Sequence, residues 1–147
     1  METQTTISPQ DDPEWMEFMA RLEAAEVEFA RGRPGDFKAL WSHTGDVTLC
    51  GGLGGQTEIG WDRVAARLDW ASSKYKDGAR GRQEFNCQIF GDTAFLVQKE
   101  IIDARIGSET EPSRQELRVT MVFRRGGEGW RIIHRHADSQ TGVTDPR

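Results

Sequence analysis

The C-terminal part of the chain contains closely spaced potential metal ligands, His134, His136 and Asp138, in the segment WRIIHRHAD. In an extended strand such alternate residues share one face, about 6.5 to 7 Å apart, and two imidazoles with a carboxylate could bind zinc. Side chains on one face of a strand fan apart, however, and the sequence offers no evident fourth ligand. In the other interpretation, both histidines pack beside Trp130 at the sheet or at a subunit interface. We therefore expect no metal site, and a metal-binding protein is kept as an alternative hypothesis.

Two arginines in the same region indicate a different chemistry. Arg118 and Arg135 would share a face with Thr120 if the two strands that carry them pair without a bulge. Two arginines that point into a cavity need an anion or buried carboxylates to compensate their charge. Arg118 and Arg135 would then bind a carboxylate or an enolate oxygen, and Thr120 would add a hydroxyl. If the arginines point outward instead, they form a solvated pair on the outer face of the sheet.

The other candidate site residues are aromatic or could transfer a proton. Trp41 and Trp61 would stack on an apolar ligand. Glu26 lies beside the apolar stripe of its helix, and either Glu26 or His43 could act as a general base. Otherwise Glu26 belongs to the solvated acidic face of that helix. No cofactor is expected, because the glycine run at residues 51–55 lacks a following Lys-Ser or Lys-Thr and reads as a flexible turn.

Residues 116–139 predict the hairpin that must position these groups. A glycine-rich turn at 126–129 separates two stretches of period-two alternation. Without a bulge, the apolar face of the first strand adjoins the tryptophan and histidine face of the second, whereas one bulged residue would flip a strand and mix the two sets. The apolar face would consist of Leu117, Val119, Met121, Phe123, Trp130 and Ile132.

Three helices are expected before the long strands. Asp12 is a capping carboxylate and Pro13 suits the first helical position of a helix that ends near Gly32. Shorter helices are expected at residues 36–42 and at about 61–75. The first helix carries an apolar stripe at three- and four-residue spacing, formed by Trp15, Phe18, Met19, Leu22, Ala25 and Phe29.

The remaining segments predict strands and loops. A short strand is expected at residues 46–50, and a hairpin is expected from the alternation at 83–90 and 93–105. Polar composition predicts loops at 76–81 and 106–113. Helices first and antiparallel strands afterwards indicate an α+β fold rather than alternating βαβ units.

The domain boundaries follow from the same elements. We expect a disordered lead at residues 1–12, one domain at residues 13–139 and a tail at residues 140–147.

The order of elements resembles the SnoaL-like branch of the nuclear transport factor 2 and ketosteroid isomerase superfamily. The resemblance is carried by GDFKALW before GDVTL, by GW before an amphipathic helix, and by LRVTMVFRR and WRIIHRHAD at the end. It implies a cone-shaped α+β barrel, with three N-terminal helices packed on a curved, mostly antiparallel sheet. The open end would hold a mostly apolar pocket, faced by the strand positions of Arg118 and Arg135, and a dimer often forms through the sheet.

The family includes isomerases, cyclases and dehydratases as well as domains that only bind or assemble. Its isomerases place an aspartate base just after the strand that follows the second helix, where this chain has Leu49 and Cys50. Steroid-type isomerisation is therefore not expected.

Composition limits the partners. The formal net charge is -5, with 29% charged residues, which disfavours nucleic acid or an anionic membrane as the main partner. The chain contains no apolar run long enough to span a bilayer, and its start lacks the pattern of a signal peptide. We expect a cytoplasmic protein whose cysteines, Cys50 and Cys87, are reduced and act as small hydrophobic residues.

The sequence thus predicts a small-molecule pocket protein. The first hypothesis is an isomerase, cyclase or dehydratase that uses general acid/base chemistry on a hydrophobic, polyketide-like or aromatic substrate, which could bear a carboxylate. The second is a non-catalytic ligand-binding or dimeric assembly domain, and the third is the metal-binding protein. A homodimer is expected because the apolar hairpin face carries more apolar area than a lone sheet face would leave in water. Whether the protein is an enzyme is left open.

Overall fold

Three α-helices and seven strands make up the part of the chain that the computed structural model describes, residues 6–143. The helices are α1 (Pro13–Phe29), α2 (Gly35–Ala39) and α3 (Trp61–Ser72), and a 3-10 turn, η1, covers Pro9–Asp11. The strands are β1 (Thr6–Ile7), β2 (Thr48–Cys50), β3 (Glu58–Ile59), β4 (Tyr75–Phe90), β5 (Thr93–Ile106), β6 (Ser113–Gly126) and β7 (Gly129–Ser139).

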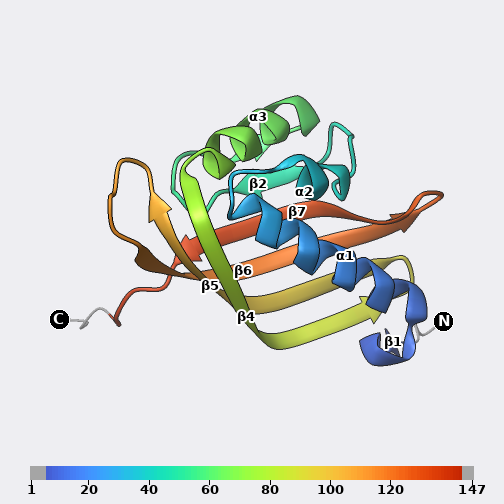
Figure 1. Cartoon of the computed structure of the whole chain (residues 1–147). Coiled ribbons are helices and arrows are strands. Elements are labelled where there is room, and N and C mark those ends of the chain that lie inside the picture. Colours follow the sequence, from blue (N-terminus) through green and yellow to red (C-terminus); the bar gives the residue numbers. More distant parts are fainter. Residues whose placement is uncertain (1–5, 144–147) are drawn as a thin grey trace.

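The strands form one sheet in the order β1-β4-β5-β6-β7-β2-β3. Every pair is antiparallel except β2 with β7. The sheet curves around α1, while α2 and α3 lie beside its β2 end (Figure 1). The expected α+β class, with three helices on a curved and mostly antiparallel sheet, is confirmed.

Helix α1 begins where the capping signal predicts. The Asp12 side chain accepts a hydrogen bond from the backbone N–H of Trp15 at 3.0 Å, which satisfies one of the free donors of the first turn. Trp15 then packs edge-on against Phe123 and Trp130, with ring centroids 5.0 and 5.1 Å apart. These contacts join α1 to the inner face of the final hairpin and form the centre of the core.

The start of β4 differs from the expected loop at 76–81. The third helix stops at Ser72, and strand pairing with β5 already begins at Tyr75. The polar, glycine-containing sequence reads as a loop, but Gly78 is needed for close packing: its N–H donates to the Ala30 carbonyl at 3.1 Å, and a Cβ there would overlap that oxygen. Pairing with β5, together with the contact between Gly78 and the end of α1, therefore overrides the local signal.

The chain ends differ in part from the expected boundaries. Residues 6–11 of the predicted lead form β1 and η1, and Ile7 pairs with Ile89 at the edge of the sheet. Residues 140–143 have no regular structure. The rest of the predicted lead and tail, residues 1–5 and 144–147, lies outside the described part of the chain.

A bulge in the final hairpin changes which residues share a face. Val122 pairs with His134 but Phe123 pairs with Ile132, so Ile133 is an extra residue on β7. Beyond this point the odd-numbered residues of β7 face inward, and Arg135 lies opposite Met121 on the inner face. The expectation of unbulged pairing is therefore wrong.

The apolar hairpin face is covered within one chain. Its residues are at most 2% exposed, because they pack beneath the helices and form part of the core: Leu117, Val119, Met121, Phe123, Trp130 and Ile132. The argument for a homodimer from this face is therefore wrong, and a dimer needs another surface.

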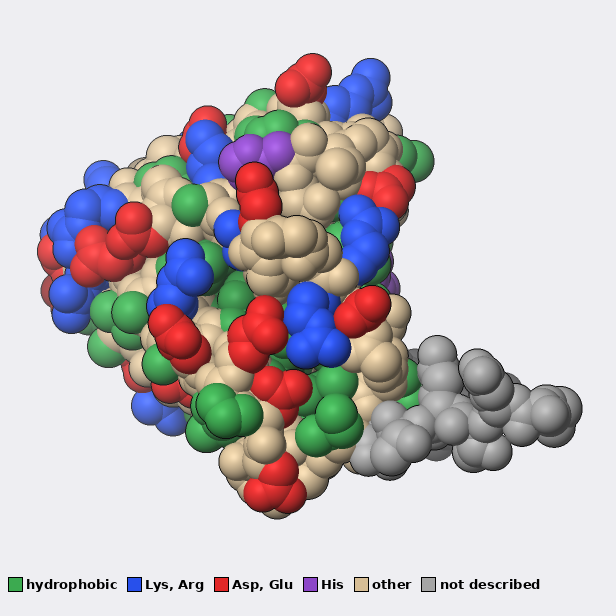
Figure 2. Space-filling view, turned by 90° about the vertical axis from the view of Figure 1, so that its right-hand side faces the viewer, with side chains coloured by type: hydrophobic (Ala, Val, Ile, Leu, Met, Phe, Trp, Pro, Cys, Tyr) green, Lys and Arg blue, Asp and Glu red, His purple; other side chains and the backbone are tan. Residues whose placement is uncertain are grey.

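One face of the molecule is electrostatically mixed. Acidic and basic side chains are interspersed on the face shown in Figure 2, with hydrophobic side chains between them, and neither sign dominates this face. None of the described helices is both long and apolar enough to cross a membrane.

Candidate functional site

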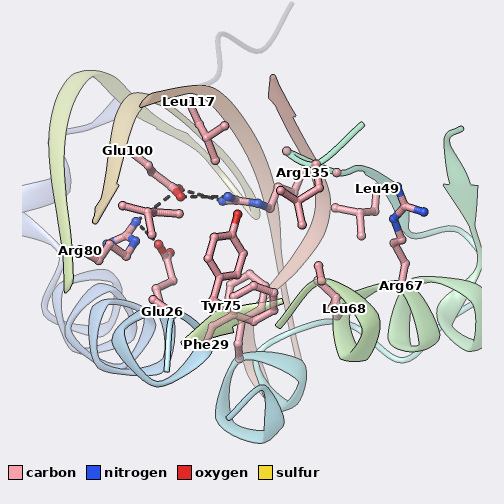
Figure 3. Close-up of a pocket in the computed structure, with 17 residues that line it drawn as sticks. Glu26, Phe29, Leu49, Arg67, Leu68, Tyr75, Arg80, Glu100, Leu117 and Arg135 are labelled. Carbon is pink, nitrogen blue, oxygen red and sulfur yellow. Dashed lines mark hydrogen bonds and ion pairs between the residues drawn. The ribbon is translucent and has the colours of Figure 1, made fainter. Parts of the chain in front are cut away.

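A cavity of about 50 Å³ lies between α1, α3 and the inner face of the sheet. Its walls are mostly apolar, with Phe29 and Leu68 on the helical side and Leu117 on the sheet side (Figure 3). One end is polar and carries a cluster of charged side chains. An apolar cavity with a few convergent polar groups is the usual form of a small-molecule site.

The charged cluster consists of two arginines and two glutamates. Arg135 donates to both oxygens of Glu100, at 2.8 Å from Nη1 and 2.9 Å from Nη2. Arg80 lies 3.2 Å from Glu100 and also forms an ion pair with Glu26. All four side chains are 13% exposed or less, so the charges are removed from water and compensate one another. We call this set the buried charge cluster.

Glu100 stays ionised at the centre of the cluster. Burial by itself opposes the charge, but the attraction of Arg135, its hydrogen bonds and the attraction of Arg80 outweigh it and lower the pKa of Glu100 to about 2. The neighbouring Gln98 amide donates to Glu100 at 2.8 Å. Glu100 raises the pKa of Arg135 against its burial, whereas burial lowers the pKa of Arg80. The cluster is therefore a fixed set of dipoles and charges at one end of the cavity.

Tyr75 forms the wall between the cluster and the helices. Its hydroxyl points toward Arg135 (Figure 3) and donates to Gln115 Oε1 at 2.5 Å. Burial raises the pKa of the phenol to about 12, so it is neutral at physiological pH. The Gln115 amide nitrogen in turn donates to the Gly52 carbonyl at 3.3 Å. A hydrogen-bonded chain thus leads from the cavity to the glycine-rich segment after β2.

Arg118 and Thr120 lie on the outer face of the sheet, opposite the side expected. Arg118 makes a two-bond ion pair with Asp138, at 2.9 and 3.0 Å, and its side chain is 68% exposed. Leu117 and Val119 of β6 face inward, so Arg118 and Thr120 face outward, and the bulge at Ile133 turns Arg135 to the opposite, inner face. Only Arg135 of the two arginines lines the cavity. The geometric argument for an anion site built from both arginines and Thr120 does not hold.

The predicted aromatic residues and His43 form a cluster of their own outside the cavity. Trp41 is 1% exposed and packs in the core, where it bridges to Ile132. The His43 ring stacks on Trp61 at 4.0 Å, and its Nε2 lies 3.0 Å from the Lys38 carbonyl oxygen. Because His43 is exposed and does not line the cavity, Glu26 is the predicted general-base candidate that the structure places at the cavity.

The two strand histidines also lie on the outer face. His134 Nδ1 is 2.7 Å from the Thr48 hydroxyl oxygen, and partial burial, with the neighbouring His136, lowers the pKa of His134. His136 and Asp138 are 4.0 Å apart, and Asp138 is held by Arg118. Within residues 6–143 the structure brings together no group of three such side chains suited to a metal ion.

Three residues at the polar end of the cavity are not identified from the sequence. Arg80 falls in the expected loop, and Tyr75 was placed at the end of the third helix. Glu100 has a usable signal: it is in period-two register with Ala94, Leu96 and Ile102 along β5, which puts a carboxylate on an inner face where Gln98 is the other polar residue.

Comparison with solved structures supports the fold. A candidate dehydratase of the NTF2-like family from Streptomyces avermitilis superposes with a TM-score of 0.74 at 20% identity, covering 92% of this chain and 100% of that one. A ketosteroid isomerase-like protein from Erwinia carotovora gives 0.66 at 18% identity, covering 86% and 98%. The CaMKII hub of S. rosetta gives 0.66 at 18% identity, covering 88% and 98%.

Sequence comparison supplies the family. No curated protein matches the chain. The sequence profile of the SnoaL-like domain matches residues 14–139, nearly the whole described fold. The resemblance seen in the sequence is thus confirmed, and the chain belongs to the SnoaL-like family.

Proposed function

We propose that the protein binds an uncharged, largely apolar carbonyl compound, of polyketide-like or aromatic type, and moves a proton on it by general acid/base chemistry. The observation that carries this proposal is the buried charge cluster at the polar end of an apolar cavity. Fixed dipoles and charges in a water-poor site stabilise charge that develops on a reacting oxygen.

The balance of charge favours a neutral ligand over the carboxylate expected from the sequence. Arg135 is already engaged by both oxygens of Glu100, and Glu26 offsets Arg80. A carboxylate added to this balanced set would be an uncompensated buried charge, which is costly. A guanidinium carries five N–H donors, and Glu100 accepts only one from each of two nitrogens of Arg135. Arg135 therefore retains donors for a carbonyl oxygen.

Glu26 is the proton acceptor in this proposal. Its carboxylate lines the cavity from α1 and is buried, whereas the other base candidate, His43, lies outside. The Glu26 carboxylate would take a proton from the carbon next to the carbonyl, and the electron pair of that C–H bond would pass to the carbonyl oxygen as an enolate. The Arg80 and Arg135 guanidinium groups would stabilise the enolate oxygen.

Deuterium exchange next to the carbonyl tests this step without knowledge of the product. NMR in D₂O would follow acetophenone-type and cyclic aryl ketones with the wild type, with Glu26→Gln and with Glu17→Gln, an exposed glutamate of the same helix. We expect catalysed exchange that Glu26→Gln lowers by about 100-fold or more and that Glu17→Gln leaves unchanged. Equal exchange by wild type and Glu26→Gln would contradict the assignment of Glu26.

Matched binding measurements test the ligand class. Thermal shift and calorimetry would compare each aryl ketone with the aryl carboxylate of the same size. The neutral compound is expected to bind more tightly. Preference for the carboxylate would restore an anion site and contradict the charge-balance argument.

The second candidate is a non-catalytic binding or assembly domain. It would bind neutral ketones without accelerating exchange.

We also propose a homodimer through the outer face of the sheet, where a row of half-buried apolar side chains interrupts the charged residues of β5 and β6: Phe95, Val97, Ile101 and Val122.

A further inference from the structure

We propose that the glycine-rich segment at residues 51–55 is a gate that admits ligands to the cavity, and that Arg67 and Gln115 hold it closed. The purpose of the gate, the entry of a ligand, rests on the proposed function. The gate itself follows from the placement and contacts of the segment, and it can be tested without a ligand.

The segment is the wall between the cavity and an open groove. Gly51, Gly52 and Leu53 line the cavity on one side. The same three residues line a surface groove of about 390 Å³ on the other side, together with Gln115 and residues at the end of β7. One length of backbone therefore separates the two, and its displacement would join the cavity to the solvent.

The cavity is too small for the proposed ligand. Its volume is about 50 Å³, whereas sites for small organic molecules usually measure roughly 300 to 1,000 Å³. An aromatic ketone therefore needs a movement of the wall. The segment at 51–55 is the part of the wall best suited to move, because it follows β2 without regular structure and four of its five residues lack a side chain.

Two side chains fasten the segment. Arg67, on α3, donates from Nη2 to the Gly54 carbonyl, and its guanidinium lies 4.6 Å from the Trp70 ring centroid, which steadies the side chain. Gln115, on β6, donates to the Gly52 carbonyl at 3.3 Å. Each contact is to a backbone oxygen, so both are lost when the segment moves.

Gly55 shows how closely the segment and Arg67 fit. Gly55 has a φ of +90°, and a Cβ at this position would overlap the Arg67 guanidinium. Gly54 has a similar φ of +86°, but a Cβ there would meet no atom within 4 Å. Alanine at either position strains the backbone to a similar degree, and only alanine at 55 also displaces Arg67.

Gln115 connects the gate to the site. It accepts from the Tyr75 hydroxyl at 2.5 Å and donates to the gate at Gly52. When the segment moves, the Gln115 amide loses its acceptor and is free to turn. The Tyr75 hydroxyl can then exchange its partner for a ligand oxygen, so that opening also readies a polar group of the cavity.

Thiol labelling measures opening directly. Leu68 is 3% exposed and lines the cavity, so the thiol introduced by Leu68→Cys reacts with methyl methanethiosulfonate only when the cavity opens. Peptide mass analysis separates this thiol from Cys50 and from Cys87, which does not line the cavity and serves as an internal control. Ile102→Cys provides a second cavity position if Leu68→Cys does not fold.

Variants of the residues that hold the segment closed are then compared in the Leu68→Cys protein. Arg67→Met should speed labelling about tenfold or more, because it removes a hydrogen bond from a charged donor, and Arg63→Met on the same helix should not. Gly55→Ala should speed labelling more than Gly54→Ala. Amide hydrogen exchange in residues 51–57 should become faster in Arg67→Met and in Gly55→Ala.

Each failure points to a different conclusion. Equal labelling rates for Arg67→Met and Arg63→Met, or for Gly55→Ala and Gly54→Ala, would refute the gate. Faster amide exchange without faster labelling would also refute it, because the segment would move without opening the cavity. If labelling behaves as expected but no neutral ketone binds, the gate stands and the proposed function fails.

Discussion

Replacement of Glu100 by glutamine is the sharpest test of the buried charge cluster. Glu100 is 1% exposed and contacts both Arg80 and Arg135. Glu100→Gln keeps the shape of the side chain but leaves two buried arginines with Glu26 as their single carboxylate within the cluster. Uncompensated buried charge is among the few causes of large destabilisation by a single substitution.

The expected loss follows from the pKa of Glu100. Its fall from the ordinary value of 4.5 to about 2 corresponds to about 3 kcal/mol of interaction that favours the charged form in the folded state. This agrees with the 3 to 5 kcal/mol typical of breaking a buried ion pair. We therefore expect Glu100→Gln to lower the free energy of unfolding at pH 7 by about 3 kcal/mol.

The pH dependence gives a second, independent signature. Because the folded-state pKa is below the unfolded one, the stabilisation by the carboxylate is complete above about pH 4.5 and is lost as the pH falls toward 2. The difference between wild type and Glu100→Gln should thus shrink to roughly 40% of its neutral value at pH 3.

Urea unfolding followed by tryptophan fluorescence would measure both effects. Glu116→Gln is the matched control, since Glu116 forms its ion pair with Lys99 at a partly exposed site, where such pairs contribute little. A loss for Glu100→Gln no larger than that for Glu116→Gln, or one independent of pH, would refute the reasoning.

Three further predictions concern Tyr75, Arg118 and self-association. Tyr75 is the single tyrosine of the chain, so tyrosinate absorbance reports on it alone and should rise near pH 12 rather than 10. The contribution of the neutral phenol to stability is complete below pH 10 and should be lost as the pH rises through 12. A normal titration near pH 10 would place the phenol in water. Arg118→Met should leave the affinity for both ketones and carboxylates unchanged in calorimetry, because Arg118 lies outside the cavity; weakened binding of either would contradict that placement. Sedimentation equilibrium should give twice the chain mass, and Val122→Glu on the outer face should give the monomer; a wild-type monomer at micromolar concentration would contradict the dimer.

Local signals in the sequence were sufficient for most of the fold. The Asp12 cap, the apolar stripe of α1 and the alternation in β6 are short-range patterns, and each specifies an element that the structure contains. Gly78 shows where such signals fail. Its segment is a strand because it pairs with β5, and the Gly78 N–H bonds to Ala30 where that pairing is interrupted; both partners are far away in the sequence and leave no local trace.

The site was harder to predict because one inserted residue decides its composition. Ile133 is an ordinary apolar residue in an alternating stretch, and nothing in its surroundings distinguishes a bulge from regular pairing. Yet the bulge turns Arg135 inward and leaves Arg118 outside. Of the two arginines proposed from the sequence, only Arg135 is compensated by a buried carboxylate. That carboxylate is Glu100, and Arg118 is not beside it.

The buried charge cluster also supports the ligand site that we propose for the cavity. Apolar residues of similar volume in place of a buried ion cluster often keep or raise stability, so folding alone does not require these charges. The cluster shares its cavity with apolar walls and with Tyr75, whose hydroxyl is linked through Gln115 to the glycine segment. Charges at the polar end of the cavity and a hydrogen-bonded glycine segment at its wall would suit an uncharged ligand: the polar end would orient the ligand, and the segment would provide its route of entry.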